Sequence, residues 1–236
     1  MGTTNDALSI NSTLPIAQSS SKPKSSSTVD TTNTTITTTT KSTASTPNRI
    51  PILGFGVYQS SGETCYAACR TALRSGYRHI DSAQYYANEA EVGRAVRDSG
   101  VPRREVYLTT KILGALGDEK DDVEKTYAAL VRSVERMNCL EEGALGQGGK
   151  GGKDGRDSGQ EAYVDLFLIH SPFSGETSRK TMWLALERAK ADGLAREIGV
   201  SNYGRKYIEE MRAFASVFPP AVNQIEVCFF PIPSLL

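Results

Sequence analysis

Three side chains of this protein, a carboxylate, a phenol and an amine, together have the chemistry of a proton donor. Asp81 ends the run RHID, Tyr86 follows it, and Lys111 ends the run VYLTTK. A phenol with a reference pKa near ~10 is a weak acid at neutral pH, and a neighbouring ammonium favours its ionised form. We therefore expect Lys111 to lower the pKa of Tyr86, while Asp81 keeps the ammonium charged and oriented. Each residue alone also fits an ordinary structural role, so the prediction depends on their convergence.

Four further polar residues stand at the ends of strand-like runs. His170 ends the apolar run LFLIH, where a lone histidine is more often a buried core group. At the end of a strand, however, its imidazole N–H could orient a substrate carbonyl. Ser201 and Asn202 follow the next run and Gln224 lies in a later one, and their hydroxyl and amide groups could pair with a carboxamide. Short polar residues at such positions also cap helices, which makes this evidence weaker.

The candidate residues share one position, at or just past the C-terminal end of a strand. Six strand-like runs alternate with helix-like stretches at 62–76, 88–100 and 121–137. Alternation with short loops predicts parallel strands joined by crossover helices. The six runs are ILGFGV (52–57), RHID (78–81), VYLTTK (106–111), VDLFLIH (164–170), REIGVSN (196–202) and AVNQIE (221–226).

This pattern predicts an α/β fold of the (β/α)8 TIM-barrel type, incomplete, with about six of the eight strands. Barrel enzymes place their chemistry at the C-terminal edge of the strands, where these candidates fall. An open doubly wound sheet is the alternative. Its Gly-rich phosphate loop would follow the first strand, but GFGVYQSSGE lacks the GxGxxG spacing.

Composition divides the chain into a tail and one ordered domain. Residues 1–48 are rich in Ser and Thr and carry no aromatic residue, so we expect a disordered tail. Residues 49–236 form the predicted partial barrel. Within it, the Gly-rich stretch 139–161 is expected to be a flexible insertion at the bottom face, away from the chemistry. Residues 228–236 form an atypical apolar tail.

Charge, hydropathy and cysteine content argue against several other functions. The formal net charge is zero and no Lys/Arg stripe is present, so nucleic-acid binding is not expected. No apolar run reaches the ~20 residues that span a bilayer, which leaves no membrane partner. With no signal peptide either, a cytoplasmic location is the default. The four cysteines form no CxxC pair and only two histidines exist, so we expect reduced thiols and no metal.

Several motifs, in order, resemble the aldo-keto reductase family. They are GFGVYQ, GYRHIDSAQYYANEAEVG, VYLTTK, DLFLIHSP, IGVSNY and NQIE. The resemblance covers residues 51 to about 227 apart from the Gly-rich insertion, and its form is close to the fungal and yeast-type reductases of small aldehydes and ketones.

The resemblance implies a catalytic tetrad of Asp81, Tyr86, Lys111 and His170. It implies that NADPH donates a hydride to a carbonyl carbon, that Tyr86 protonates the oxygen, and that His170 orients the substrate. It also implies a small-molecule carbonyl substrate and a monomer. The other implied contacts are Ser201, Asn202 and Gln224 to the nicotinamide carboxamide, Val57 near the cofactor, and Tyr58 in the substrate pocket.

The C-terminal part departs from the family pattern. After NQIEV the family continues with a long helix and two more strands, whereas this sequence reads CFFPIPSLL and ends. We therefore expect a C-terminally truncated barrel that lacks most of the cofactor's phosphate site. The alternative to an active reductase is then an inactive or partner-dependent barrel fragment, whose open sheet edges could associate.

Overall fold

A parallel sheet of six strands forms the centre of the computed structural model, which describes residues 13–15, 20–21, 49–116, 122–140, 143–145 and 162–226. The order of the strands across the sheet is their order in the chain. A doubly wound sheet would reverse direction partway across, so this order identifies the barrel type. The strands are β4 (Phe55–Gly56), β5 (His79–Asp81), β6 (Tyr107–Ile112), β7 (Val164–Ile169), β8 (Ala195–Ser201) and β10 (Asn223–Gln224).

The prediction of an incomplete barrel with six strands is confirmed. All six strand-like runs contain a strand of the sheet, and every neighbouring pair is parallel. The described part of the chain is therefore a half-barrel, with β4 and β10 as its edge strands.

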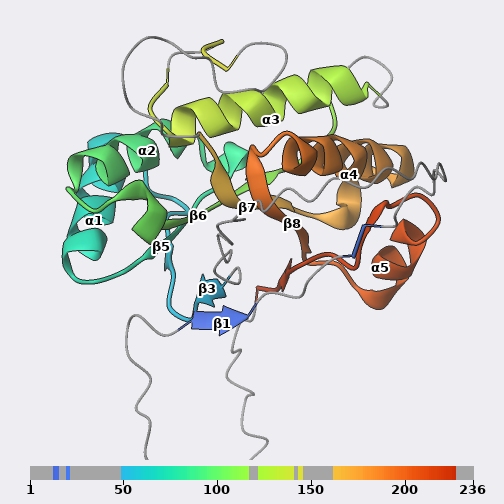
Figure 1. Ribbon diagram of the computed structural model, residues 1–236, viewed down its shortest axis with the longest axis horizontal. Helices are drawn as coiled ribbons and strands as arrows, with labels where there is room; N and C mark the ends of the chain where they lie inside the picture. Colours follow the sequence, from blue (N-terminus) through green and yellow to red (C-terminus); the bar gives the residue numbers. More distant parts are fainter. Residues whose placement is uncertain are drawn as a thin grey trace, which may run out of the picture.

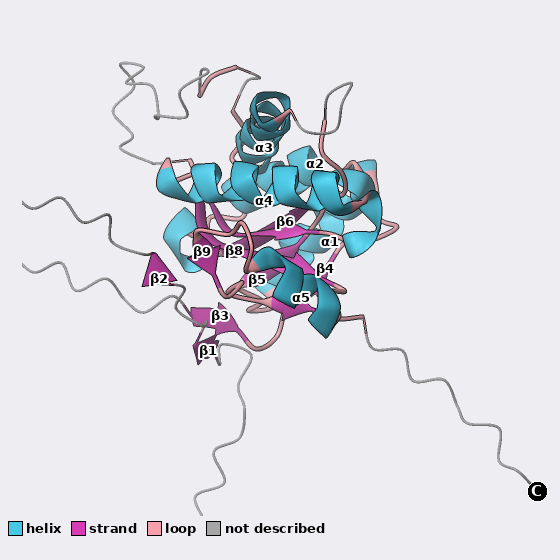
Figure 2. Cartoon of the chain, turned by 90° about the vertical axis from the view of Figure 1, so that its right-hand side faces the viewer, coloured by secondary structure: helices cyan, strands magenta, loops and turns pink. Residues whose placement is uncertain are grey.

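Helices connect the successive strands, and α2, α3 and α4 lie on one side of the sheet (Figures 1 and 2). The predicted helix at 121–137 is observed from Val123, where the Asp122 carboxylate accepts a hydrogen bond of 2.8 Å from the backbone N–H of Lys125. Such a cap satisfies one of the unpaired amide groups at a helix N-terminus. The helices are α1 (Gly62–Arg74), α2 (Glu89–Asp98), α3 (Val123–Met137), α4 (Glu176–Ala191) and α5 (Arg205–Met211), with short 3₁₀ turns η1 (Gln84–Tyr86), η2 (Arg103–Glu105) and η3 (Pro172–Ser174).

Alternate side chains of the strands enter two different environments. On the outer face, Leu108, Phe167 and Ile198 join the main apolar core, in which Trp183 of α4 is fully buried. The inner face has only a small apolar cluster, and toward the C-terminal ends of the strands it carries polar side chains instead. The inner cluster consists of Tyr107, Leu166, Leu168 and Ala221, with Ile50 and Val222 packed against it.

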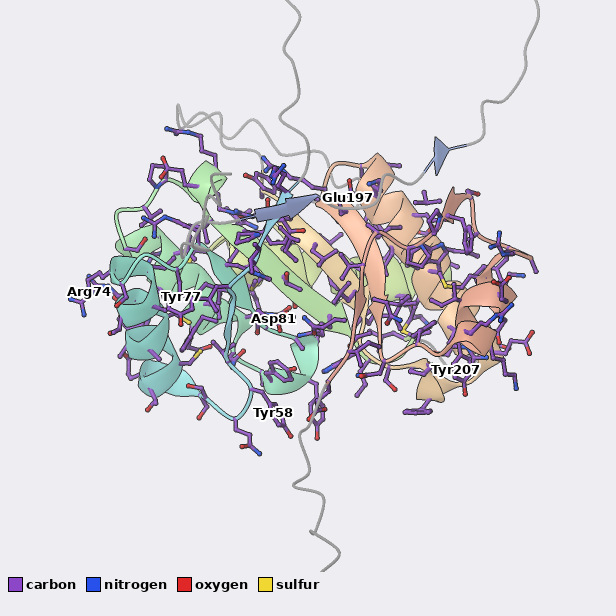
Figure 3. The ribbon with its side chains drawn as sticks, turned by 90° about the horizontal axis from the view of Figure 1, so that it is seen from below. Tyr58, Arg74, Tyr77, Asp81, Glu197 and Tyr207 are labelled. Carbon is purple, nitrogen blue, oxygen red and sulfur yellow. The ribbon has the colours of Figure 1, made fainter. Side chains whose placement is uncertain are left out.

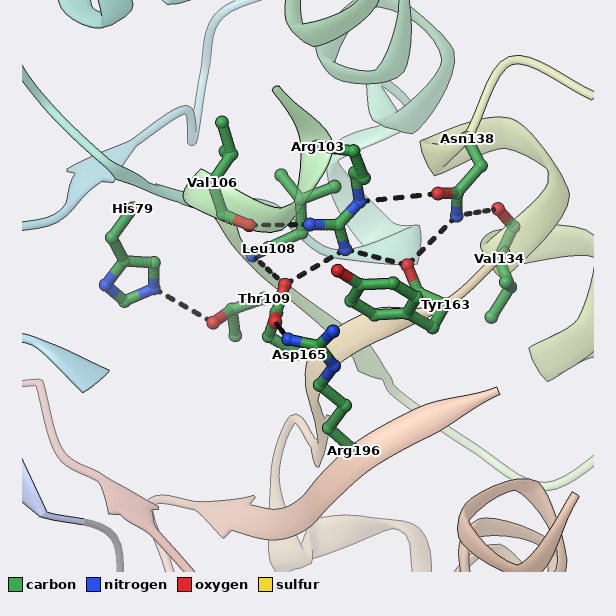
Figure 4. A network of polar contacts seen from close by, with 10 residues as sticks. All are labelled: His79, Arg103, Val106, Leu108, Thr109, Val134, Asn138, Tyr163, Asp165 and Arg196. Carbon is green, nitrogen blue, oxygen red and sulfur yellow. Dashed lines mark hydrogen bonds and ion pairs between the residues drawn. The ribbon is translucent and has the colours of Figure 1, made fainter. Parts of the chain in front are cut away.

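A buried charge network holds the opposite, N-terminal ends of the strands together (Figure 4). The Arg103 guanidinium donates to the Asp165 carboxylate at 2.9 Å, and Asp165 also accepts from the backbone N–H of Leu108 at 2.9 Å. Arg196 donates to the other oxygen of Asp165 at 3.1 Å. The guanidinium carbons of Arg103 and Arg196 lie 4.2 and 3.8 Å from the centroid of the Tyr163 ring. These contacts fix β7 between β6 and β8 far from the predicted chemistry.

Two short segments of the predicted N-terminal tail form strands. Strand β1 (Thr13–Pro15) pairs antiparallel with β3 (Arg49–Pro51), and β2 (Ser20–Ser21) pairs with β9 (Val217–Phe218). Backbone pairing with a strand edge needs no apolar side chains, so composition alone gives no signal for it. The remainder of 1–48, most of the 139–161 stretch and residues 228–236 lie outside the described residues, and the domain division remains a prediction.

None of the described helices is long and apolar enough to cross a membrane.

The contact between α2 and α3 requires a residue without a side chain at position 93. A Cβ atom at Gly93 would lie 2.3 Å from the carbonyl oxygen of Arg136. In an ordinary helix Gly→Ala is stabilising by ~1 kcal/mol. Here we expect Gly93→Ala to lower the free energy of unfolding by about 1–3 kcal/mol, because the two helix backbones must separate. Urea denaturation measures this change.

Gly114→Ala is the matched control, since a Cβ there would meet no atom within 4 Å. It should change the free energy of unfolding by less than about 0.5 kcal/mol. A Gly93→Ala protein as stable as the wild type would contradict the observed packing of α2 on α3.

Candidate active site

A pocket of about 1030 Å³ opens at the C-terminal edge of the sheet. In Figure 3, Asp81 lies between Tyr58, which follows β4, and Glu197, the third residue of β8. Lys111 and Val57 lie behind the pocket wall, each 1% exposed. The structure thus brings the predicted residues together, although their catalytic roles remain predictions. The predicted residues that line the pocket are Tyr58, Asp81, Tyr86, His170, Ser201, Asn202 and Gln224.

An ion pair between Lys111 and Asp81 lies at the base of this pocket. The Lys111 ammonium donates to Oδ1 of Asp81 and, at 2.9 Å, to the backbone carbonyl of Ser82. The second carboxylate oxygen of Asp81 accepts from the side-chain amide of Gln224 at 2.8 Å. Strands β5, β6 and β10 are therefore joined by side chains across the concave face of the half-barrel.

The Tyr86 phenol lies next to this ion pair. Lys111 Nζ is 5.1 Å from the centroid of the Tyr86 ring, and the His170 ring centroid is 5.5 Å from it. The ring of Tyr58 lies 5.0 Å away on the solvent side. Tyr86 belongs to η1, which β5 positions directly above the sheet edge. A small molecule in the pocket would therefore meet the phenol and the imidazole together.

The expectation that Lys111 lowers the pKa of Tyr86 is wrong for this structure. Burial, followed by the negative charges of Asp81, Tyr58 and Glu226, raises the pKa of Tyr86 to about 12. The ammonium of Lys111 is already paired with Asp81. A phenol with this pKa is fully protonated at neutral pH, as a proton donor must be, and it is a poor base.

His170 occupies the edge of the pocket as a neutral ring. Burial, followed by the positive charge of Lys111, lowers its pKa from the usual value. Its backbone N–H donates to the carbonyl of Ile112 at 2.8 Å, which continues the pairing of β7 with β6. Among the described residues its Nδ1 atom is buried without a hydrogen-bond partner. Because the ring itself lines the pocket, the imidazole can still bind a polar group of a ligand.

Ser201, Asn202 and Gln224 form one polar group on the opposite rim. The Ser201 hydroxyl donates to the backbone carbonyl of Gln224 at 3.0 Å, and the Asn202 side-chain amide donates to that hydroxyl at 3.2 Å. Asn202 has a positive φ of 59°, a conformation that asparagine tolerates better than most residues. The three residues predicted to hold a carboxamide are thus adjacent, with Gln224 directed to Asp81.

Sequence reasoning missed Asn88 as a positioning residue. Its side chain is fully buried, accepts from the Ser82 hydroxyl at 2.6 Å, and donates to the backbone carbonyls of Val57 and Ser60 at 2.9 and 2.7 Å. It therefore ties the loop that carries Tyr58 to the loop that carries Tyr86. The only sequence signal was an Asn within the YANE motif.

Glu89, the next residue in the chain, is a second positioning residue that sequence reasoning missed. Its buried carboxylate accepts from the Thr110 hydroxyl at 2.5 Å and from the Arg136 guanidinium, also at 2.5 Å. These contacts attach the start of α2 to β6 and α3, directly behind Lys111. A buried, paired carboxylate of this kind cannot be distinguished from a surface one by sequence alone.

The polar side chains that line the pocket fit the carboxamide of a nicotinamide cofactor better than they fit its phosphate groups. The rim offers hydroxyl and amide groups, and at Gly56 a Cβ would meet no atom within 4 Å, so a flat ring has room. The described residues that line the pocket include no Arg or Lys. Within the described ranges, no group of three or more His, Cys, Asp or Glu residues could hold a metal ion.

The order of the strands and this pocket define a barrel with a polar site at its C-terminal edge. The pattern of the "Aldo/keto reductase family" matches residues 53–141 and 152–234. The match covers more than half of the chain, and the chain belongs to this family.

Individual relatives are similar over about three quarters of this chain. An aldo-keto reductase of Mycolicibacterium smegmatis is 39% identical over 181 residues, which are 76% of this chain and 54% of the relative. An aldehyde reductase of Saccharomyces cerevisiae is 33% identical over 210 residues, 78% of this chain and 58% of the relative. A methylglyoxal reductase of Salmonella typhi is 36% identical over 179 residues, 75% of this chain and 57% of the relative. The chain therefore spans little more than half the length of these curated relatives.

Solved structures are also similar over about three quarters of this chain. An aldo/keto reductase from Brucella melitensis superposes with a TM-score of 0.60 at 35% identity, covering 77% of this chain and 60% of the other. The Bombyx mori aldo-keto reductase in complex with NADP gives a TM-score of 0.58 at 29% identity, over 77% of this chain and 56% of that one.

The raised pKa of Tyr86 predicts how the protein titrates with alkali. In the folded state, the wild type and Tyr86→Phe should form equal amounts of tyrosinate up to about pH 11, because Tyr86 stays protonated. In concentrated urea the wild type should form one tyrosinate more, with a midpoint near ~10. The folded pKa exceeds the unfolded one, so Tyr86 favours folding below pH ~10 and this contribution is lost as the pH rises toward 12.

Ultraviolet absorbance of tyrosinate measures both states. An additional tyrosinate in the folded wild type near pH ~8 would contradict the structure, and would instead support a phenol acidified by Lys111.

Proposed function

We propose that this protein is an NADPH-dependent reductase that converts aldehyde and ketone carbonyls to alcohols. The observation that carries the proposal is the convergence of Tyr86, His170 and the Asp81–Lys111 pair on one pocket. Relatives named as an aldehyde reductase and a methylglyoxal reductase support the reaction type. A related structure that contains NADP supports the cofactor. A cytosolic location is part of the same proposal.

When bound, the nicotinamide would supply the hydride that the carbonyl carbon receives. Tyr86 gives its phenolic proton to the carbonyl oxygen, so that the alcohol forms as the C=O π bond breaks. An alkoxide is a much stronger base than a phenolate, so even a phenol with a pKa of about 12 transfers its proton readily. Solvent at the open rim then restores the proton to Tyr86.

The remaining residues orient the reactants. The neutral His170 ring would donate a hydrogen bond to the carbonyl oxygen beside the phenol, while Tyr58 would form an apolar wall. Lys111 and Asp81, held by their ion pair, would fix the wall of the pocket beside the Tyr86 ring. Ser201, Asn202 and Gln224 would hold the carboxamide of the nicotinamide, with Val57 behind it.

A specific observation favours a second candidate, a barrel that does not retain the cofactor and acts without catalysis or with a partner. In the described residues, the pocket lining has hydroxyl, amide and carboxylate groups but no cation for the cofactor's phosphates. NADPH binding distinguishes the two candidates, because the non-enzymatic one predicts no rise of the melting temperature at saturating cofactor.

Tyr86→Phe tests the proposed proton donor. We expect it to lower kcat for a small aldehyde by roughly 10²- to 10⁴-fold, because the acid is removed while the ring remains. The increase in melting temperature produced by NADPH should stay the same. NADPH consumption and thermal unfolding are the two measurements.

Tyr66→Phe is the matched control. It removes a hydroxyl that bonds to Asp98 on the outer helices, so kcat should not change. Equal loss of cofactor binding and turnover in Tyr86→Phe would argue against Tyr86 as the acid, and no NADPH binding by the wild type would reject the reductase proposal.

A further inference from the structure

We propose that β1 and β2, the two short strands of the N-terminal segment, form a strap that holds the two edges of the half-barrel together. Strand β1 pairs antiparallel with β3, and β2 pairs antiparallel with β9 (Figure 2). Strand β3 precedes the edge strand β4, and β9 precedes the other edge strand, β10. The N-terminal segment therefore pairs with the chain next to both edges. This inference does not depend on the proposed reaction.

The sheet has an open side that the hydrogen bonds between its own strands do not close. Among the described residues, β4 pairs with β5 alone and β10 pairs with β8 alone. In a closed barrel, the ladder of hydrogen bonds around the ring fixes the distance between any two strands. In an open sheet only the curvature of the sheet does so, and a second connection between the edges limits how far they separate.

The length of chain between β1 and β2 determines how large a separation the strap allows. Pro15, the last residue of β1, is in register with Arg49. Ser20, the first residue of β2, is in register with Phe218. The chain from Pro15 to Ser20 spans about 18 Å at full extension. With about 5 Å between each strand and its partner, Arg49 and Phe218 lie no more than about 28 Å apart.

The strap also acts on the pocket, because β3 forms part of the pocket lining. Ile50 and Pro51 line the pocket, and Ile50 packs against the inner apolar cluster. Val222, between β9 and β10, packs against the same cluster. The two segments that the strap joins are thus the segments that cover the inner cluster from either edge of the sheet.

The two strand pairs should depend on each other. A pair of two or three residues is too short to be stable alone, because it offsets little of the entropy lost when the chain is ordered. Once one strand is paired, the short connection keeps the other close to its own partner and raises its effective concentration there. Loss of either pair should therefore weaken the other. Two strands that only cover exposed edges would show no such dependence.

Pairs of proline substitutions in the whole chain break one strand at a time. Thr13→Pro with Leu14→Pro removes every backbone N–H donor from β1, since Pro15 has none. Ser20→Pro with Ser21→Pro does the same for β2.

Thr38→Pro with Thr39→Pro is the matched control, because these residues belong to none of the described strands. The measurement is amide hydrogen exchange at residues 49–50 and 217–218. Strand β7 serves as the internal reference, since it lies in the middle of the sheet.

Each strand variant should accelerate exchange at the partner of the broken strand roughly tenfold, and at the partner of the other strand at least about threefold. Exchange in β7 should not change, and the control variant should behave as the wild type. Acceleration at the broken strand's own partner alone would overturn the strap, because the two pairs would then be independent. No acceleration at either partner, or equal acceleration in β7, would overturn it as well.

Discussion

The site depends on one buried ion pair. Lys111 is among the largest fully buried side chains of the described residues, and an ammonium in that position is tolerated only with a matching acceptor set. Asp81 and the carbonyl of Ser82 supply it, and Gln224 occupies the other oxygen of Asp81. The ion pair therefore fixes the positions of the C-terminal ends of β5, β6 and β10. Tyr86 and His170 lie next to it.

Several other contacts in the structure keep those strand ends in place. Asn88 fastens two loops of the pocket, Glu89 attaches α2 behind Lys111, and the Arg103–Asp165 network fixes the other end of the sheet. Close backbone contacts serve the same purpose. At Gly199 a Cβ would lie 2.5 Å from the carbonyl oxygen of Val222, so β8 and the approach to β10 require glycine there.

Much of the fold and the grouping of the site followed from sequence, because both depend on local patterns. Strand-like runs that end in Asp81, Lys111 or His170 indicate strands, and their alternation with helices indicates that the strands are parallel, which brings their ends to one edge. Residue chemistry also indicated that the phenol needs charged neighbours. Residue chemistry could not show whether the pKa of Tyr86 is raised or lowered. That shift depends on how deeply Tyr86 is buried and on which group already neutralises Lys111.

Other features were beyond sequence reasoning for the same reason, that they depend on long-range geometry. The bond from Gln224 to Asp81 joins residues from the two ends of the ordered region. The pairing of β1 with β3 uses backbone groups in a segment whose composition predicts no structure.

A double-mutant cycle on the buried pair tests the central claim most directly. Free energies of unfolding would be measured by urea denaturation for Asp81→Asn, Lys111→Met and the double variant. Each single change leaves a buried polar partner without its counterpart and should cost about 3–5 kcal/mol. The double variant should cost less than the two single changes together by more than about 1 kcal/mol. Additive costs would contradict the account, since they would show that the two side chains do not depend on each other.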